Sequence, residues 1–236
     1  MPGKKKITKK KLKEPDEFFT LTQRAFLFIT GHLRKIITGG IIFLVILLLI
    51  VFFQMWERQK EEEAYRDFNL ALEIYQRAAS PGRERLPLEN KENKNVLAKF
   101  DEVIGKFPRT SSGKLSLLYK GNLHLRLAEF EEAIKAYQTF LEKAGKEKLY
   151  RLFAMEGLGL AYQGKKDYEN ALQTYQRILE MGDSVQLAGA YLNIGLCYEK
   201  LGKNKEALEN YKVFLKTSEK SLMTNMILKK ISNLEK

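Results

Sequence analysis

The chain has 236 residues, 30% charged and 44% apolar, and this composition excludes a disordered or collagen-like protein. Its single cysteine, Cys197, excludes an intrachain disulfide and a cysteine-rich metal cluster. With only two histidines, His32 and His124, a histidine-rich metal site is not expected. The net charge is +12, and residues 1–35, with ten basic and three acidic side chains, carry +7 of it. Positive charge is therefore concentrated near one end.

Seven of the ten residues from Lys4 to Lys13 are lysines. Such a run is usually a solvated tail. Binding to nucleic acid is disfavoured, because the tail lacks interleaved aromatic or arginine residues for stacking on bases. Attraction to anionic lipid beside a membrane fits the pattern better.

The 21 residues from Ile36 to Trp56 contain no charge, and Ile41–Phe53 is an unbroken run of Ile, Leu, Val and Phe. As a helix, this stretch rises about 31 Å, which matches the ~30 Å hydrocarbon core of a bilayer. The alternatives are a buried helix of a soluble domain, which rarely lacks a polar stripe, and a cleaved signal peptide. No small-residue cleavage site follows the run, so the sequence predicts an uncleaved signal anchor.

The flanking charges predict the orientation of this anchor. Arg34 and Lys35 abut its start, whereas Glu57–Arg77 carries four basic and six acidic residues. The N-terminal side is therefore expected in the cytoplasm and the remainder across the membrane, which in a bacterium is the periplasm. Apolar residues at helical spacing over Asp16–Leu33 predict an amphipathic helix on the cytoplasmic membrane face, with a loose juxtamembrane segment as the alternative.

Three later segments align without gaps from a glycine to an alanine and then to a tyrosine. These are Gly121, Ala133 and Tyr137; Gly159, Ala171 and Tyr175; and Gly195, Ala207 and Tyr211. The interval is 38 and then 36 residues. A weaker half-copy, with Val96, Phe100 and Val103, precedes them. Repeats of this length indicate helix pairs that bury their apolar faces only by stacking.

These residues resemble the tetratricopeptide repeat, in which a bulky residue, Leu-Gly, Tyr, Ala and Phe or Tyr recur within a helix-turn-helix. Tyr191, Ile194-Gly195, Tyr198, Ala207 and Tyr211 give the best copy. The resemblance implies an all-α fold, a right-handed α-solenoid behind a single transmembrane helix. Helices are expected at 93–106, 111–127, 129–143, 148–163, 167–181, 184–201 and 204–217, with a last amphipathic helix ending near Leu234.

The predicted organisation has four parts. They are a basic cytoplasmic tail with its juxtamembrane helix (1–35), a transmembrane anchor (36–56), a membrane-proximal helix and linker (57–92), and the repeat domain with a capping helix (93–236).

No motif points to catalysis, a cofactor or a metal site, and no enzyme activity is expected. Gly159–Lys166 approaches a phosphate-binding loop but lacks the Ser or Thr after the lysine and lies within a helical repeat. His124 occupies a repeat position usually held by Tyr and is expected to be a packed core residue. Cys197 is expected to be an inert thiol. The run Glu61–Glu63 is interpreted as a solvated helix face.

The order of basic tail, single span, continuous helix and repeat array resembles the ancillary SecYEG translocon subunit family (YfgM-like). The residues that carry this resemblance are Asp16–Phe19 before the span, Trp56 at its exit, and the closing stretch Leu228–Leu234. It implies a single-pass protein of the bacterial inner membrane. Its expected partners are Sec translocon subunits, periplasmic chaperones or client polypeptides. The alternative is a scaffold for another envelope assembly, such as an outer-membrane biogenesis, cell-division or pilus complex.

In tetratricopeptide arrays, the first helix of each pair lines a groove that accepts polypeptide. The resemblance implies that the groove-lining face of this chain consists of Leu118, Asn122, Leu125, Phe153, Glu156, Leu160, Gln163, Leu192, Leu196 and Glu199. The set has few basic residues, so it suits extended polypeptide better than nucleic acid or phosphate. Phe153, Gln163 and Glu199 are the clearest surface candidates. The alternative is that several of the leucines pack inside a tight superhelix.

Overall fold

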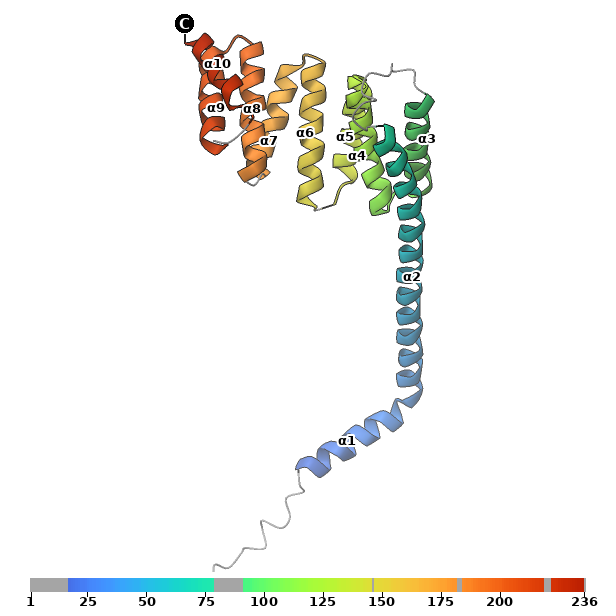
Figure 1. Ribbon diagram of the computed structural model, residues 1–236. Helices are drawn as coiled ribbons and strands as arrows, with labels where there is room; N and C mark the ends of the chain where they lie inside the picture. Colours follow the sequence, from blue (N-terminus) through green and yellow to red (C-terminus); the bar gives the residue numbers. More distant parts are fainter. Residues whose placement is uncertain (1–16, 79–90, 146, 182–183, 219–221, 236) are drawn as a thin grey trace, which may run out of the picture. The chain divides into compact units, whose positions relative to one another are not determined.

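The computed structural model describes residues 17–78, 91–145, 147–181, 184–218 and 222–235, and within these ranges all regular structure is helical (Figure 1). The lysine run and most of the predicted linker at 80–92 lie outside the described residues. The chain divides into two compact units, one up to Arg58 and one from Gln59 onward. The predicted all-α class is confirmed.

The first unit contains helix α1 (Glu17–Gly31) and the beginning of helix α2 (Leu33–Ala78). The most apolar stretch of α2 has a mean hydropathy of 3.2, and none of it is buried. Every side chain from Ile41 to Phe53 is exposed. A core helix of a soluble domain would be covered by protein, so the exposure is compatible with a single-pass membrane anchor. The helix predicted over Asp16–Leu33 corresponds to α1, and its contact with a membrane surface stays a prediction.

The second unit is an array of antiparallel helix pairs, α4/α5, α6/α7 and α8/α9, that stand side by side in Figure 1. Their order and bounds follow the predicted elements closely. The helices are α3 (Lys91–Lys106), α4 (Ser111–Arg126), α5 (Phe130–Lys143), α6 (Lys148–Gly164), α7 (Tyr168–Met181), α8 (Ser184–Lys200), α9 (Asn204–Thr217) and α10 (Thr224–Leu234).

A tyrosine–glycine contact holds each pair together. Tyr137, Tyr175 and Tyr211 are fully buried on the second helices. A β-carbon at Gly121, Gly159 or Gly195 of the matching first helix would lie 2.7, 2.4 or 2.5 Å from the ring of its tyrosine. Real β-carbons do not approach so closely, so only glycine admits the ring at these crossings. The identical spacing in the sequence therefore reflects one packing contact made three times.

The turn within each pair repeats another backbone feature. Ala128, Lys166 and Gly202, each seven residues after the repeat glycine, have φ of 57°, 65° and 73°. Only the last of the three is a glycine, the residue that adopts this conformation without a steric penalty. The equivalent conformations support the alignment of the repeats.

The end of α2 and helix α3 form a further layer of the array. Phe68 and Ala71 of α2 are buried in the same core as Phe100 of α3 and Leu123 of α4. The compact unit accordingly begins at Gln59, before the expected start of the repeat domain at 93. The half-copy in the sequence is thus the second helix of a pair whose first helix belongs to α2.

The interpretation of Glu61–Glu63 as a solvated face is wrong for Glu61. Its carboxylate accepts hydrogen bonds from the backbone N–H groups of Ser111 and Ser112, at 2.8 and 3.0 Å, and from the Ser112 hydroxyl at 2.9 Å. These donors lie at the start of α4, where backbone N–H groups lack partners within the helix and favour a negative charge. Glu61 therefore caps a helix 50 residues further along the chain.

Candidate protein-binding groove

Two neighbouring cavities open along the first helices of the pairs. The α4–α6 cavity has a volume of about 300 Å³ and the α6–α8 cavity about 180 Å³. The α4–α6 cavity is lined by Leu118, Tyr119, Asn122, Leu125, Tyr137, Tyr150, Phe153, Glu156, Gly157 and Leu160. The α6–α8 cavity is lined by Leu152, Phe153, Glu156, Tyr175, Ile178, Gly189, Ala190 and Asn193.

The two cavities share two lining residues of helix α6, Phe153 and Glu156. They are one turn apart on an amphipathic helix whose other face, including Leu152 and Met155, is buried. Phe153 is 44% exposed, a high value for a large apolar side chain. An aromatic ring and a carboxylate are thus presented together on the surface of the repeat unit.

Six of the ten sequence-predicted residues meet at the α4–α6 cavity: Leu118, Asn122, Leu125, Phe153, Glu156 and Leu160. Leu118 is largely buried and Leu125 half-buried, and both also pack against the core of the first pairs. These two leucines therefore line the candidate groove and also pack inside the array, as the two alternatives for this face separately predicted.

The side chains of the remaining four predicted residues make contacts between neighbouring helices. Gln163 is half-buried, and its Nε2 donates to Sγ of Cys197 at 3.2 Å. Leu192 and Leu196 are half-buried against a core shared by α9 and α10. The expectation that Gln163 is a clear surface residue does not hold, because its amide is engaged by α8.

Glu199 is likewise engaged by neighbouring helices. Its carboxylate accepts hydrogen bonds from Nζ of Lys230 at 2.8 Å and from the Tyr211 hydroxyl. Burial acts to raise the pKa of Glu199, but the two hydrogen bonds outweigh it and hold this pKa below its usual range. Because Lys230 belongs to α10, Glu199 ties the capping helix to the last pair and is not a free surface group.

The three repeat tyrosines differ in what their hydroxyls contact. The Tyr137 hydroxyl donates to Oδ1 of Asn122 at 2.7 Å, and that of Tyr211 donates to Glu199. The buried Tyr175 hydroxyl has no hydrogen-bond partner among the described residues. Burial raises the pKa of Tyr175, so the hydroxyl keeps its proton. Sequence reasoning assigned Tyr175 only to the core and missed it, together with Asn193, as a cavity residue.

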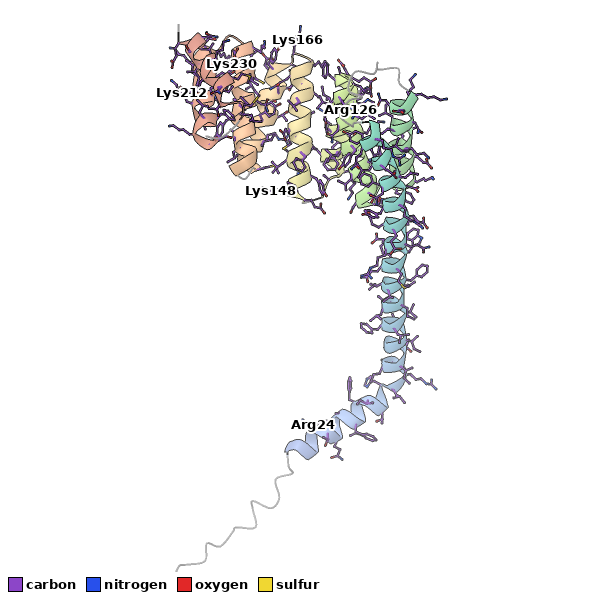
Figure 2. The ribbon with its side chains drawn as sticks, viewed as in Figure 1. Arg24, Arg126, Lys148, Lys166, Lys212 and Lys230 are labelled. Carbon is purple, nitrogen blue, oxygen red and sulfur yellow. The ribbon has the colours of Figure 1, made fainter. Side chains whose placement is uncertain are left out.

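The cavities carry little charge. Of the described residues that line them, Glu156 alone bears a formal charge. Basic side chains lie elsewhere: Figure 2 shows Lys148 at one end of α6 and Lys166 just beyond the other. An apolar hollow with one carboxylate does not match phosphate or nucleic acid, whose binding needs Lys or Arg.

Cys197 and His124, whose side chains are the most reactive types near the cavities, are both packed in the interior. Burial raises the pKa of the Cys197 thiol to about 11, so it is protonated and unreactive at neutral pH. His124 is buried, with its Nδ1 2.6 Å from Oε2 of Glu129. Within the described ranges, no group of three or more His, Cys, Asp or Glu residues is placed to hold a metal ion.

Solved structures with a similar fold include the apo form of RapI, with a TM-score of 0.61 and 15% identity over 73% of this chain. A tetratricopeptide repeat protein from Parabacteroides merdae has a TM-score of 0.56 and 17% identity over 72% of it. At these identities the likeness concerns the fold alone. The alignments span 63% and 60% of those two chains, respectively.

A curated human relative, the Intraflagellar transport protein 88 homolog, is 25% identical over 106 residues. This match covers 44% of the present chain and only 12% of the human protein. The family described as tetratricopeptide repeat-like domain matches residues 28–236, which include the apolar part of α2 and the whole helical array. The chain therefore belongs to the tetratricopeptide repeat-like domain family.

Proposed function

We propose that this protein is a membrane-anchored module that binds other polypeptides in the groove formed by the α4–α6 and α6–α8 cavities. The observation that carries the proposal is that Phe153 and Glu156 of α6 line both of these mainly apolar hollows. Repeat arrays use such extended surfaces for protein partners. An exposed aromatic side chain in a hollow is also a common anchor of protein interfaces.

Its proposed role is that of an ancillary subunit of the Sec translocon, which receives newly translocated proteins or periplasmic folding factors. The support is the architecture: a basic segment, one apolar helix and a repeat array. Residues 36–56 serve as the anchor in the bacterial inner membrane. The N-terminal tail faces the cytoplasm and the repeat domain faces the periplasm.

The orientation is tested with reporters fused to the C-terminus of the full chain. The excess of positive charge before the span predicts that the C-terminus lies in the periplasm. A fused reporter that works only in the periplasm should therefore be active, and one that works only in the cytoplasm should be inactive. Activity of the cytoplasmic reporter alone would contradict the proposed topology.

The binding role is tested by photocrosslinking in the native membrane. A photoreactive phenylalanine analogue replaces Phe153 in one variant and Leu149 in another. Both side chains are exposed on α6, but Leu149 lines neither cavity. Groove binding predicts adducts at position 153 that are absent or much weaker at position 149.

The identity of the adducts separates the roles. Translocon subunits, chaperones or translocating chains at position 153 support the Sec role. Outer-membrane, division or pilus components alone would replace it with the scaffold role. Equal labelling at both positions would argue against binding in the groove and would place the binding site on the membrane-proximal helix at 57–79 instead.

A further inference from the structure

The connections between the helices of the array lie at two opposite edges. The intra-pair edge comprises the turns within the pairs α4/α5, α6/α7 and α8/α9, each with one helical turn on either side (123–133, 161–171 and 197–207). The inter-pair edge comprises the connections from one pair to the next, bounded in the same way (103–114, 140–151, 178–187 and 214–227). Figure 2 shows Lys148 at the inter-pair edge and Lys166 at the intra-pair edge.

The two edges differ in charge. Residues 103–114 and 140–151 of the inter-pair edge contain seven Lys or Arg and two acidic residues, whereas 178–187 contains only acidic ones. The whole intra-pair edge contains six Lys or Arg and seven acidic residues. Arg109 and Lys143 are exposed and make no ion pair with another described residue. Positive charge is thus concentrated in the first two connections of the inter-pair edge.

Large apolar side chains are exposed at the inter-pair edge as well. They are Leu149 at the start of α6, and Leu222 and Met226 at the start of α10. Helix α10 begins at this edge, because Ile227 is buried in the same core as Phe214 near the end of α9. The intra-pair edge, which the structure describes throughout, exposes no large apolar side chain. Exposed apolar residues beside basic ones are typical of a surface that enters the headgroup region of a membrane.

The same edge receives the chain from the predicted anchor. Glu61 of α2 caps the start of α4, so this part of α2 lies at the inter-pair edge. Glu61 follows Trp56, the predicted end of the anchor, by five residues, which span at most about 18 Å even when fully extended. Chain connectivity therefore tethers the array to the bilayer by the edge whose side chains suit a membrane surface.

Acidic residues of α2 reduce the positive charge of this edge but do not cancel it. Residues 59–67 contain four acidic and two basic side chains. Two of the acidic ones are engaged within the protein, because Glu61 caps α4 and Asp67 lies 3.8 Å from Nζ of Lys106. Together with 103–114 and 140–151, the segment contains nine basic and six acidic residues, a net charge of +3.

We propose that the inter-pair edge of the array docks on the anionic phospholipid surface of the membrane that holds the anchor. Arg109, Lys143 and Lys148 lie against lipid phosphates, and the exposed apolar side chains of α6 and α10 enter the headgroup region. Because the anchor already confines the edge to the bilayer, docking is in effect intramolecular and a few charges suffice. This inference goes beyond polypeptide binding in the groove and depends only on the anchor at 36–56.

The test uses the full chain, one copy per nanodisc, in phosphatidylcholine with or without phosphatidylglycerol. A bimane label is attached through Leu149→Cys, Leu222→Cys or Lys166→Cys, while the buried Cys197 is left in place. Lipids with a nitroxide near the headgroup quench a label that lies on the membrane. Docking predicts strong quenching at 149 and 222 in anionic discs, weaker quenching in neutral discs or at high salt, and little quenching at 166.

Two triple variants, each labelled at position 149, separate the basic edge from net charge alone. Replacement of Arg109, Lys143 and Lys148 with Gln should lower the docking equilibrium about a hundredfold, at roughly fivefold for each charge. Replacement of Lys166, Lys200 and Lys205 with Gln removes the same number of exposed positive charges from the intra-pair edge and should leave quenching unchanged. Equal losses in the two variants would overturn the proposal.

The single tryptophan, Trp56, reports separately on the anchor. If the lipids fail to quench Trp56, the anchor itself is contradicted, and this inference with it. If Trp56 is quenched but positions 149 and 222 are quenched no more than position 166, the anchor stands and the docking surface does not. Quenching that requires two chains in one disc would assign the exposed apolar side chains to a second copy of the protein and would likewise overturn the proposal.

Discussion

Replacement of Tyr137 with alanine is expected to lower the free energy of unfolding of the repeat domain by about 3–5 kcal/mol, the scale for deleting a buried aromatic side chain. Tyr137 is fully buried, and its hydroxyl donates to Asn122. Its ring lies against Gly121 of α4 and also against Gly157 of α6, where a β-carbon would approach the ring to 2.4 Å. One side chain thus fills the space between three helices and two repeats.

The loss should also change how the array unfolds. Repeat proteins are held together by contacts between neighbouring units, so a weakened junction separates their unfolding. Urea denaturation of the detergent-solubilised chain, followed by circular dichroism, should show a broadened or two-step transition. Tyr65→Ala is the control, because Tyr65 is 58% exposed and its removal should change stability by less than about 0.5 kcal/mol. Equal effects of the two substitutions would contradict the role of Tyr137.

The helical array was predictable because its signal occurs three times. The helix expected at 129–143 is α5 (Phe130–Lys143), and that expected at 204–217 is α9 (Asn204–Thr217). Each repeat glycine lies against the tyrosine ring of its own pair, and each repeat alanine is fully buried in the same core as that tyrosine. Such local packing leaves a regular spacing in the sequence. The sequence pattern therefore predicts the pairs and their bounds within a few residues.

Contacts between residues that are far apart in the sequence leave no regular spacing from which they could be predicted. Glu61 lies in a run of three glutamates that looks solvated, yet its partners are at the start of α4, 50 residues away. Similarly, the sequence shows that Tyr175 matches Tyr137 and Tyr211, but the acceptor of each hydroxyl depends on which side chain the neighbouring helix presents. The unpaired hydroxyl becomes visible only once the three environments are compared.

The candidate groove was predictable in part for the same reason. A single helix face was carried across all three repeats, and six of its residues do meet at the α4–α6 cavity. In the last repeat, however, Leu192, Leu196 and Glu199 contact the core and the lysine that α10 contributes. The position of a capping helix is a property of the folded array, so equivalent residues have different surroundings in its middle and at its end.

Replacement of Gly159 with alanine is expected to lower the free energy of unfolding by about 1–3 kcal/mol, the cost of overpacking a well-filled core. The added β-carbon would lie 2.4 Å from Cζ and 2.6 Å from Cε1 of Tyr175. Tyr175 is fully buried, so the overlap is relieved only if its ring or the two paired helices shift. This cost must exceed the ~1 kcal/mol that alanine gains over glycine in the interior of a helix.

Gly189→Ala provides a control of opposite sign. Gly189 lies within α8, and a β-carbon there would meet no atom within 4 Å, so only the gain in helix propensity remains. Chemical denaturation should therefore show a stability increase of about 0.5–1 kcal/mol for Gly189→Ala and a decrease for Gly159→Ala. Combining Gly159→Ala with Tyr175→Leu should cost less than the sum of the two single changes, because the smaller side chain relieves the clash. A stabilising Gly159→Ala, or strictly additive costs in the double variant, would show that the tyrosine–glycine contact does not limit the approach of the paired helices.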